Sequence, residues 1–186
     1  MSGRAVILIA VGGNIAVAAI TCALRGWTAT GLHAAARNTA RFSCLWFIVA
    51  FAAPGLARLV RVLPHEAILI RAFVVAQFVH YAMVALLLAI FESANVVRNP
   101  PRAAAFLLGG FTIVTGLGWV ATPRPSKLHS ITRSLLLYVI FMIFFGAFVR
   151  TTVQPLHLLS ALLGVALILR LASRFAFFTA REGTTG

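Results

Sequence analysis

One segment of the chain, Ala72 to Phe91, reads AFVVAQFVHYAMVALLLAIF and contains 20 residues without a single charge. A helix rises about 1.5 Å per residue, so about 20 apolar residues cross the roughly 30 Å hydrocarbon core of a bilayer. The composition points the same way, because 61% of the 186 residues are hydrophobic and 10% are charged. Such a chain is too apolar for an ordinary soluble domain. The segment therefore predicts a transmembrane helix in an integral membrane protein.

Five more uncharged runs lie on either side of this segment, and most of the prolines fall between the runs. Proline costs least there, because its missing N–H breaks no helical hydrogen bond. We predict an all-α fold, a polytopic helical membrane bundle with six transmembrane helices in one domain over residues 1–186. The spans are expected at about 5–24, 38–59, 68–91, 103–122, 130–149 and 155–173.

The first run, Ala5 to Leu24, has an alternative interpretation as a cleaved signal peptide, because Ala16, Val17 and Ala18 form an A-x-A sequence. A signal core is usually about 7 to 15 residues long, and this run is longer. We therefore expect the first span to be retained.

The basic residues predict the orientation, because Lys and Arg are enriched in cytoplasmic loops. Ten of the 16 fall on the side of the N-terminus and six on the other side, if the six spans alternate. Both termini are therefore expected in the cytoplasm. This asymmetry also explains much of the net charge of +13, so we expect no nucleic-acid partner, because no recognition motif accompanies the charge.

The sequence offers few groups for soluble-enzyme chemistry. The three acids, Glu66, Glu92 and Glu182, are expected in loops or in the C-terminal tail. No carboxylate pair would then lie within the membrane for a proton relay, which disfavours a proton-coupled transporter. Cys22 and Cys44 are expected at similar depth near the outer ends of the first two spans. They are interpreted as two small apolar side chains, although a disulfide is geometrically conceivable.

His80 is the most informative polar residue, because it lies about 13 Å of helix beyond Arg71, near the bilayer midplane. Gln77 lies three residues before His80 and four residues before Tyr81. The three side chains therefore share one side of the helix. A polar group at this depth must face protein. His80 could therefore hydrogen-bond to another span, or it could ligate a metal, for which haem iron is the expected case.

A haem between helices usually needs a second axial ligand. His157 is the best match in depth, and His129 would reach His80 only if its helix were tilted or began lower. Basic residues at the membrane edges could hold the haem propionates or could serve as ordinary interfacial anchors. They are Arg71, Arg133 and Arg150.

Three segments resemble a group of small bacterial ferric-reductase-like transmembrane proteins. The first is AAARNTARFSCLWFIVAFAAPGLARL, Ala34 to Leu59, whose Arg-x-Thr-Ala-Arg-x-Ser opening is similar to the second span of that group. The second is RAFVVAQFVHYAMVALL, in which His80 matches the second histidine of a His-x-x-His pair and Gln77 stands in place of the first. The third is GGFTIVTGLGWVATPRPSKLHSITRSLLLYVIFMIFF, Gly109 to Phe145, which includes His129.

This resemblance implies a six-helix domain with haem b in the bacterial inner membrane. The related proteins are ferric reductases and the membrane subunit of periplasmic methionine sulfoxide reductase systems. His80 would be an axial ligand, and electrons would come from a cytoplasmic reductase or from quinol. We expect no flavin or nicotinamide domain in this chain, so a separate partner would supply the electrons. The alternative is a non-catalytic membrane subunit or assembly partner that has kept the fold without haem.

Overall fold

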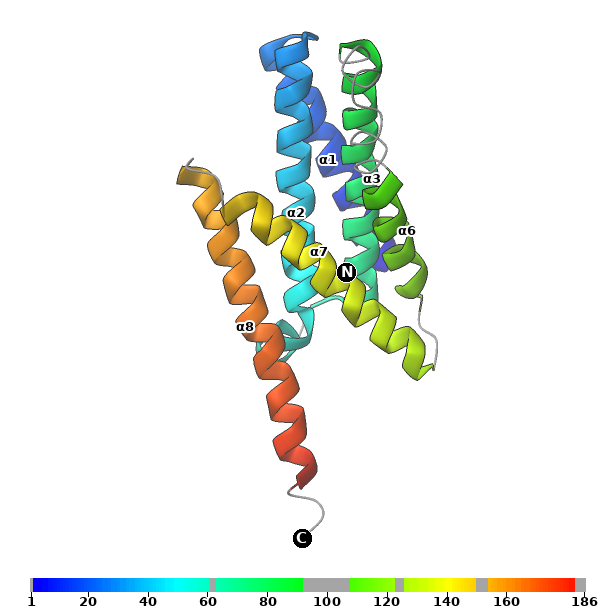
Figure 1. Cartoon of the computed structure of the whole chain (residues 1–186), viewed down its shortest axis with the longest axis vertical. Helices are drawn as coiled ribbons and strands as arrows, with labels where there is room; N and C mark the ends of the chain where they lie inside the picture. The colour runs from blue at the N-terminus through cyan, green and yellow to red at the C-terminus, as the bar shows by residue number, and fades with distance from the viewer. Residues whose placement is uncertain (1, 61–62, 92–107, 123–125, 150–153, 183–186) are drawn as a thin grey trace.

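The computed structural model of the chain describes residues 2–60, 63–91, 108–122, 126–149 and 154–182. Within these ranges all regular elements are helices, and consecutive helices run in alternating directions (Figure 1). They are α1 (Gly3–Arg25), α2 (Ala29–Leu59), α3 (Glu66–Ile90), α6 (Gly110–Val120), α7 (Lys127–Val149) and α8 (Gln154–Glu182). The predicted all-α membrane bundle is confirmed.

Four of these helices, α1, α2, α3 and α7, are long and apolar enough to cross a membrane. α6 and the segment His157–Ser173 of α8 are apolar but shorter. The fourth predicted span began at residue 103, and residues 103–107 lie outside the described ranges. The structure therefore supports a multi-pass membrane protein with four clear spans, and the count of six stays a prediction.

α2 begins nine residues before the expected start of the second span. The side chain of Thr28 accepts a hydrogen bond from the backbone N–H of Gly31 at 3.2 Å, which is the usual way to cap a helix N-terminus. The extra turns bury Leu32 and Ala35 in a small cluster with Cys22 of α1 and Leu87 of α3. Packing against two neighbouring helices thus makes this mixed polar segment helical.

α2 is the central helix of the bundle, because it packs against α1, α3 and α8. It also meets α7 through aromatic rings, with the centroids of Phe51 and Phe141 5.1 Å apart and those of Phe47 and Phe144 5.3 Å apart. α6 packs between α3 and α7. The helices α2, α3, α6 and α7 therefore surround a common space.

The contact between α2 and α8 depends on Gly55. A Cβ atom at this position would clash with the backbone carbonyl of Leu169. Small residues allow two membrane helices to approach closely, which increases van der Waals contact where water cannot drive association.

Polar side chains join the first three helices inside the bundle. Asn14 of α1 is fully buried, and its Nδ2 atom donates to Ser43 Oγ of α2 at 3.0 Å and to the carbonyl of Ala76 in α3. These hydrogen bonds fix α1 against the surface on which α2 and α3 present their candidate functional residues.

Candidate functional site

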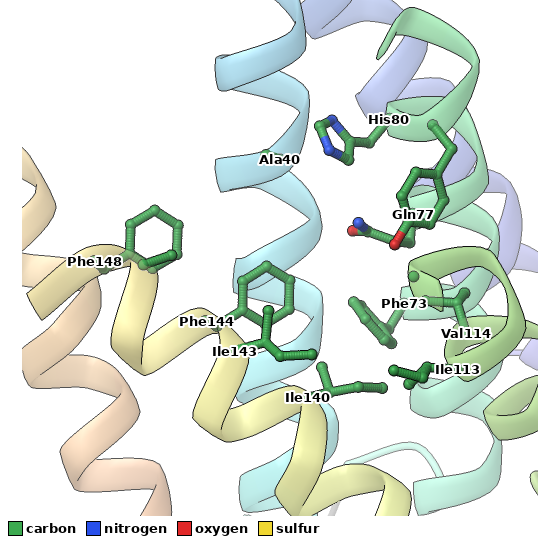
Figure 2. A pocket seen from close by; sticks show the side chains of 13 residues that line it. Ala40, Phe73, Gln77, His80, Ile113, Val114, Ile140, Ile143, Phe144 and Phe148 are labelled. Atoms are coloured by element: carbon green, nitrogen blue, oxygen red, sulfur yellow. The ribbon is translucent and has the colours of Figure 1, made fainter. Parts of the chain in front are cut away.

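A cavity of about 240 Å³ lies between α2, α3, α6 and α7 (Figure 2). Its wall is mainly apolar, and its polar side chains, Gln77, His80 and Tyr81, all come from α3. The remaining lining residues are Ala40, Phe73, Gly110, Ile113, Val114, Ile140, Ile143, Phe144, Ala147 and Phe148. A concave, apolar site with a few polar groups on one side is the usual form of a small-molecule site.

His80 is held against α2. The residue is 8% exposed, and its Nδ1 atom lies 3.2 Å from the hydroxyl oxygen of Thr39, which is itself fully buried. The single hydroxyl proton of Thr39 is directed at the carbonyls of Ala35 and Ala36, both 2.9 Å away. The Thr39 oxygen therefore accepts a hydrogen bond from Nδ1–H of His80, which leaves Nε2 as the nitrogen with the lone pair. This hydrogen bond between two spans is the interaction that a structural role for His80 requires.

Among the residues that line the cavity, Gln77 is the one with a buried polar side-chain atom that lacks a hydrogen-bond partner in the described part of the chain. The side chain is 6% exposed, and Tyr81 follows it by one turn of the same helix. Its Oε1 atom has no hydrogen-bond partner among the described residues. Figure 2 shows the Gln77 amide pointing away from its own helix, towards the space that α2 and α7 border. A buried carbonyl oxygen without a partner is uncommon and calls for an explanation.

The other predicted haem ligands lie elsewhere. His157 is exposed on α8, a helix that packs against α2 and α7. His129 lies two residues after the start of α7, where its Nε2 atom is 2.7 Å from the Thr122 carbonyl. Ile140, the first cavity residue of α7, comes 11 residues later, which is about 16 Å along a helix. The expected pairing of His80 with either histidine is not formed.

The residues around the cavity therefore do not fit a haem with two axial histidines, because two imidazoles must then face the same space. The predicted propionate partners do not complete such a site either. Arg71 is exposed at the start of α3, and Arg133 forms an ion pair with Glu66. Arg150 lies outside the described residues.

The two cysteines are free thiols in this structure. Cys22 belongs to the small cluster with Leu32, whereas Cys44 is part of the main core.

A second polar cluster was not expected from the sequence. Glu66, expected in a loop, is the first residue of α3, and Oε1 lies 3.1 Å from Nη1 of Arg170. The same Arg170 nitrogen donates to the Phe51 carbonyl at 2.7 Å, in the turn before Pro54. This hydrogen bond therefore joins α8 to the turn of α2 in which Pro54 removes one backbone donor.

The sequence contained only a weak signal for this cluster. An acidic residue directly before an apolar run is typical of the first turn of a helix. Nothing in the sequence near Arg170 distinguishes it from the basic residues that follow a span. Thr39 and Asn14 were likewise not identified, because their partners lie on other helices.

Comparison with protein-family models, with curated proteins and with solved structures finds no match to this chain. The fold and the cavity therefore define the protein only at the level of its class, a multi-pass helical membrane protein with a cavity between its helices.

Proposed function

We propose that this chain is a non-catalytic membrane component that binds a small, mainly apolar molecule in the cavity between α2, α3, α6 and α7. The observation that carries the proposal is the cavity itself, about 240 Å³ in volume, with apolar side chains on most of its wall and polar side chains from α3 alone. An apolar cavity of about 150 Å³ is large enough to bind benzene. This cavity therefore has room for a molecule with two fused rings.

The position of the cavity supports uptake from the bilayer. Ile143 and Ala147 of α7 belong to the lining and are exposed on the outside of the bundle. α7 is one of the helices that are long and apolar enough to span a membrane. The exposed face of such a helix contacts lipid, so an apolar molecule dissolved in the bilayer reaches the cavity without crossing water.

The test is whether naphthalene stabilises the purified protein in detergent. At a naphthalene concentration of about 100 times Kd, the free energy of unfolding should increase by about 2.7 kcal/mol. This increase raises the unfolding temperature by about 5 to 10 °C. Val114→Phe should abolish the shift by filling the cavity, since Val114 is buried in its wall. Val139→Phe is the matched control, because Val139 is exposed on α7 outside the cavity. A shift of equal size in all three proteins would refute the proposal.

A second candidate is a haem b electron carrier of the ferric-reductase-like kind, and one observation favours it. His80 lines the cavity with Nε2 as its lone-pair nitrogen. In this candidate His80 would ligate the iron, and His157 or His129 would have to move to the cavity to complete the site. A cytoplasmic reductase or quinol would supply the electrons that such a haem carries.

The absorption spectrum distinguishes the two candidates. Protein purified from haem-replete cells should be colourless under the first proposal, both as isolated and after addition of dithionite. A Soret band that sharpens on reduction and disappears in His80→Ala would replace the first proposal with the second. The mutants His157→Ala and His129→Ala would then identify the other ligand.

We also propose that the protein resides in the bacterial inner membrane with both termini in the cytoplasm. The support is the distribution of Lys and Arg, ten against six, between the two sides of the predicted topology. A membrane-protein partner fits a non-catalytic component, and the lipid bilayer is the source of its ligand in this proposal.

A further inference from the structure

We infer that the cavity selects a molecule that carries a hydroxyl group on an apolar body, and that Oε1 of Gln77 accepts the hydrogen bond from this hydroxyl. The inference rests on the proposed function and adds the chemical class of the ligand. It starts from the one cavity side chain with a buried oxygen that has no hydrogen-bond partner in the described part of the chain.

The unpaired oxygen identifies which half of a hydrogen bond the ligand must supply. Oε1 is an acceptor only, so its missing partner is a donor. Burying a carbonyl without a partner is unfavourable, and a ligand that supplies a donor removes this cost when it binds. A ligand without a donor leaves the cost in place.

The rest of the wall argues for a neutral donor. Opposite α3 the cavity is bounded by apolar side chains, among them Val114, Ile140 and Phe144. No Asp or Glu is among the residues that line it. An ammonium group would therefore lose its hydration without gaining a countercharge, which is strongly unfavourable. A hydroxyl group loses far less hydration and satisfies the same oxygen.

The aromatic side chains favour a flat ligand body. Phe73 and Phe144 both line the cavity, and their ring centroids lie 6.1 Å apart in an edge-to-face arrangement. Phe148 continues this surface along α7, its ring parallel to that of Phe144. Rings pack against aromatic rings in such offset and edge-to-face geometries. A two-ring aromatic alcohol, 2-naphthol, is therefore a suitable probe.

The experiment compares 2-naphthol with 2-methylnaphthalene, which has nearly the same shape but no donor. Binding to the full-length protein in detergent is measured for both, and each value is corrected for partition of the probe into protein-free micelles. We expect 2-naphthol to bind about fivefold to tenfold more tightly, the amount that one neutral hydrogen bond contributes. Gln77→Met should bind the two probes equally, because methionine has a similar shape without the oxygen.

The outcomes separate this inference from the proposed function. Equal binding of the two probes to the unmodified protein would overturn the inference and leave the cavity function standing. If neither probe bound, both would fall. A preference for 2-naphthol that persisted in Gln77→Met would also overturn the inference, since another group would then accept the hydrogen bond. If Gln77→Met did not fold, Gln77→Leu would serve, and the comparison in the unmodified protein needs no variant.

Discussion

The Nη1 atom of Arg170 in α8 lies 3.1 Å from Oε1 of Glu66 at the start of α3, and this ion pair joins residues 104 positions apart. Arg170 is 4% exposed, and its guanidinium carbon lies 4.8 Å from the centroid of the Phe51 ring. One side chain therefore connects three helices. Because Arg170 is buried, its charge depends on these contacts for stabilisation.

Replacing Glu66 with Ala should destabilise the protein by about 3 kcal/mol, because it leaves the buried guanidinium of Arg170 without a countercharge. Arg133→Ala should cost less, about 0.2 to 1 kcal/mol. Arg133 lies 3.6 Å from the other carboxylate oxygen, and a quarter of its side chain, 25%, is exposed. Unfolding in detergent would measure both. Equal losses would show that Arg170 does not depend on Glu66.

Gly55→Ala should weaken the bundle, because the new methyl group would meet the backbone of Leu169 and push α8 away from α2. Overpacking of this kind typically costs about 1 to 3 kcal/mol. Gly164→Ala is the matched control on α8, where a Cβ atom meets no neighbour within 4 Å. That change should be neutral or stabilising by up to about 1 kcal/mol. Thermal unfolding of the two variants would measure the difference, and equal effects would contradict the close approach.

Thr39→Val removes the hydroxyl that accepts the His80 hydrogen bond while keeping the shape of the side chain. We expect the free energy of unfolding to fall by about 1 kcal/mol, as for other hydrogen bonds between membrane helices. Thr39→Ser retains the hydroxyl and should lose less. A double-mutant cycle with His80→Ala would measure the interaction energy directly. An interaction energy of zero would mean that this hydrogen bond does not hold α2 and α3 together.

A reporter enzyme that is active only in the periplasm should remain inactive when fused after Glu182, because we expect the C-terminus in the cytoplasm. The same reporter fused after Trp27, between α1 and α2, should be active. Because one fusion is expected to be active and the other inactive, each is a control for the expression of the other. Activity after Glu182 together with inactivity after Trp27 would invert the proposed topology.

The membrane-spanning helices could be predicted from the sequence where an uncharged run is enough to define a helix. α1, α3 and α7 begin and end within about three residues of the expected boundaries, since in a bilayer the length of the apolar run decides where the helix lies. α2 differs, because the residues before Asn38 become helical only by packing against α1 and α3.

The candidate site could be predicted only in part. His80, Gln77 and Tyr81 were expected on one helix face, and they do line the cavity together. Their partners were not predictable, because helix spacing relates residues within one helix and gives no distances between helices. For the same reason a similar depth could not bring His157 to His80, since His157 is exposed on α8 and does not line the cavity.

The two partners of Glu66 become available at different times during synthesis of the chain. A membrane protein is synthesised from its N-terminus, so α3 is made long before α8. Arg133 follows Glu66 by 67 residues in the sequence, and Arg170 follows it by 104. During biogenesis the carboxylate therefore meets the weaker partner first and the buried one last. Until α8 is made, Arg133 is the one of these two partners that can compensate the charge of Glu66.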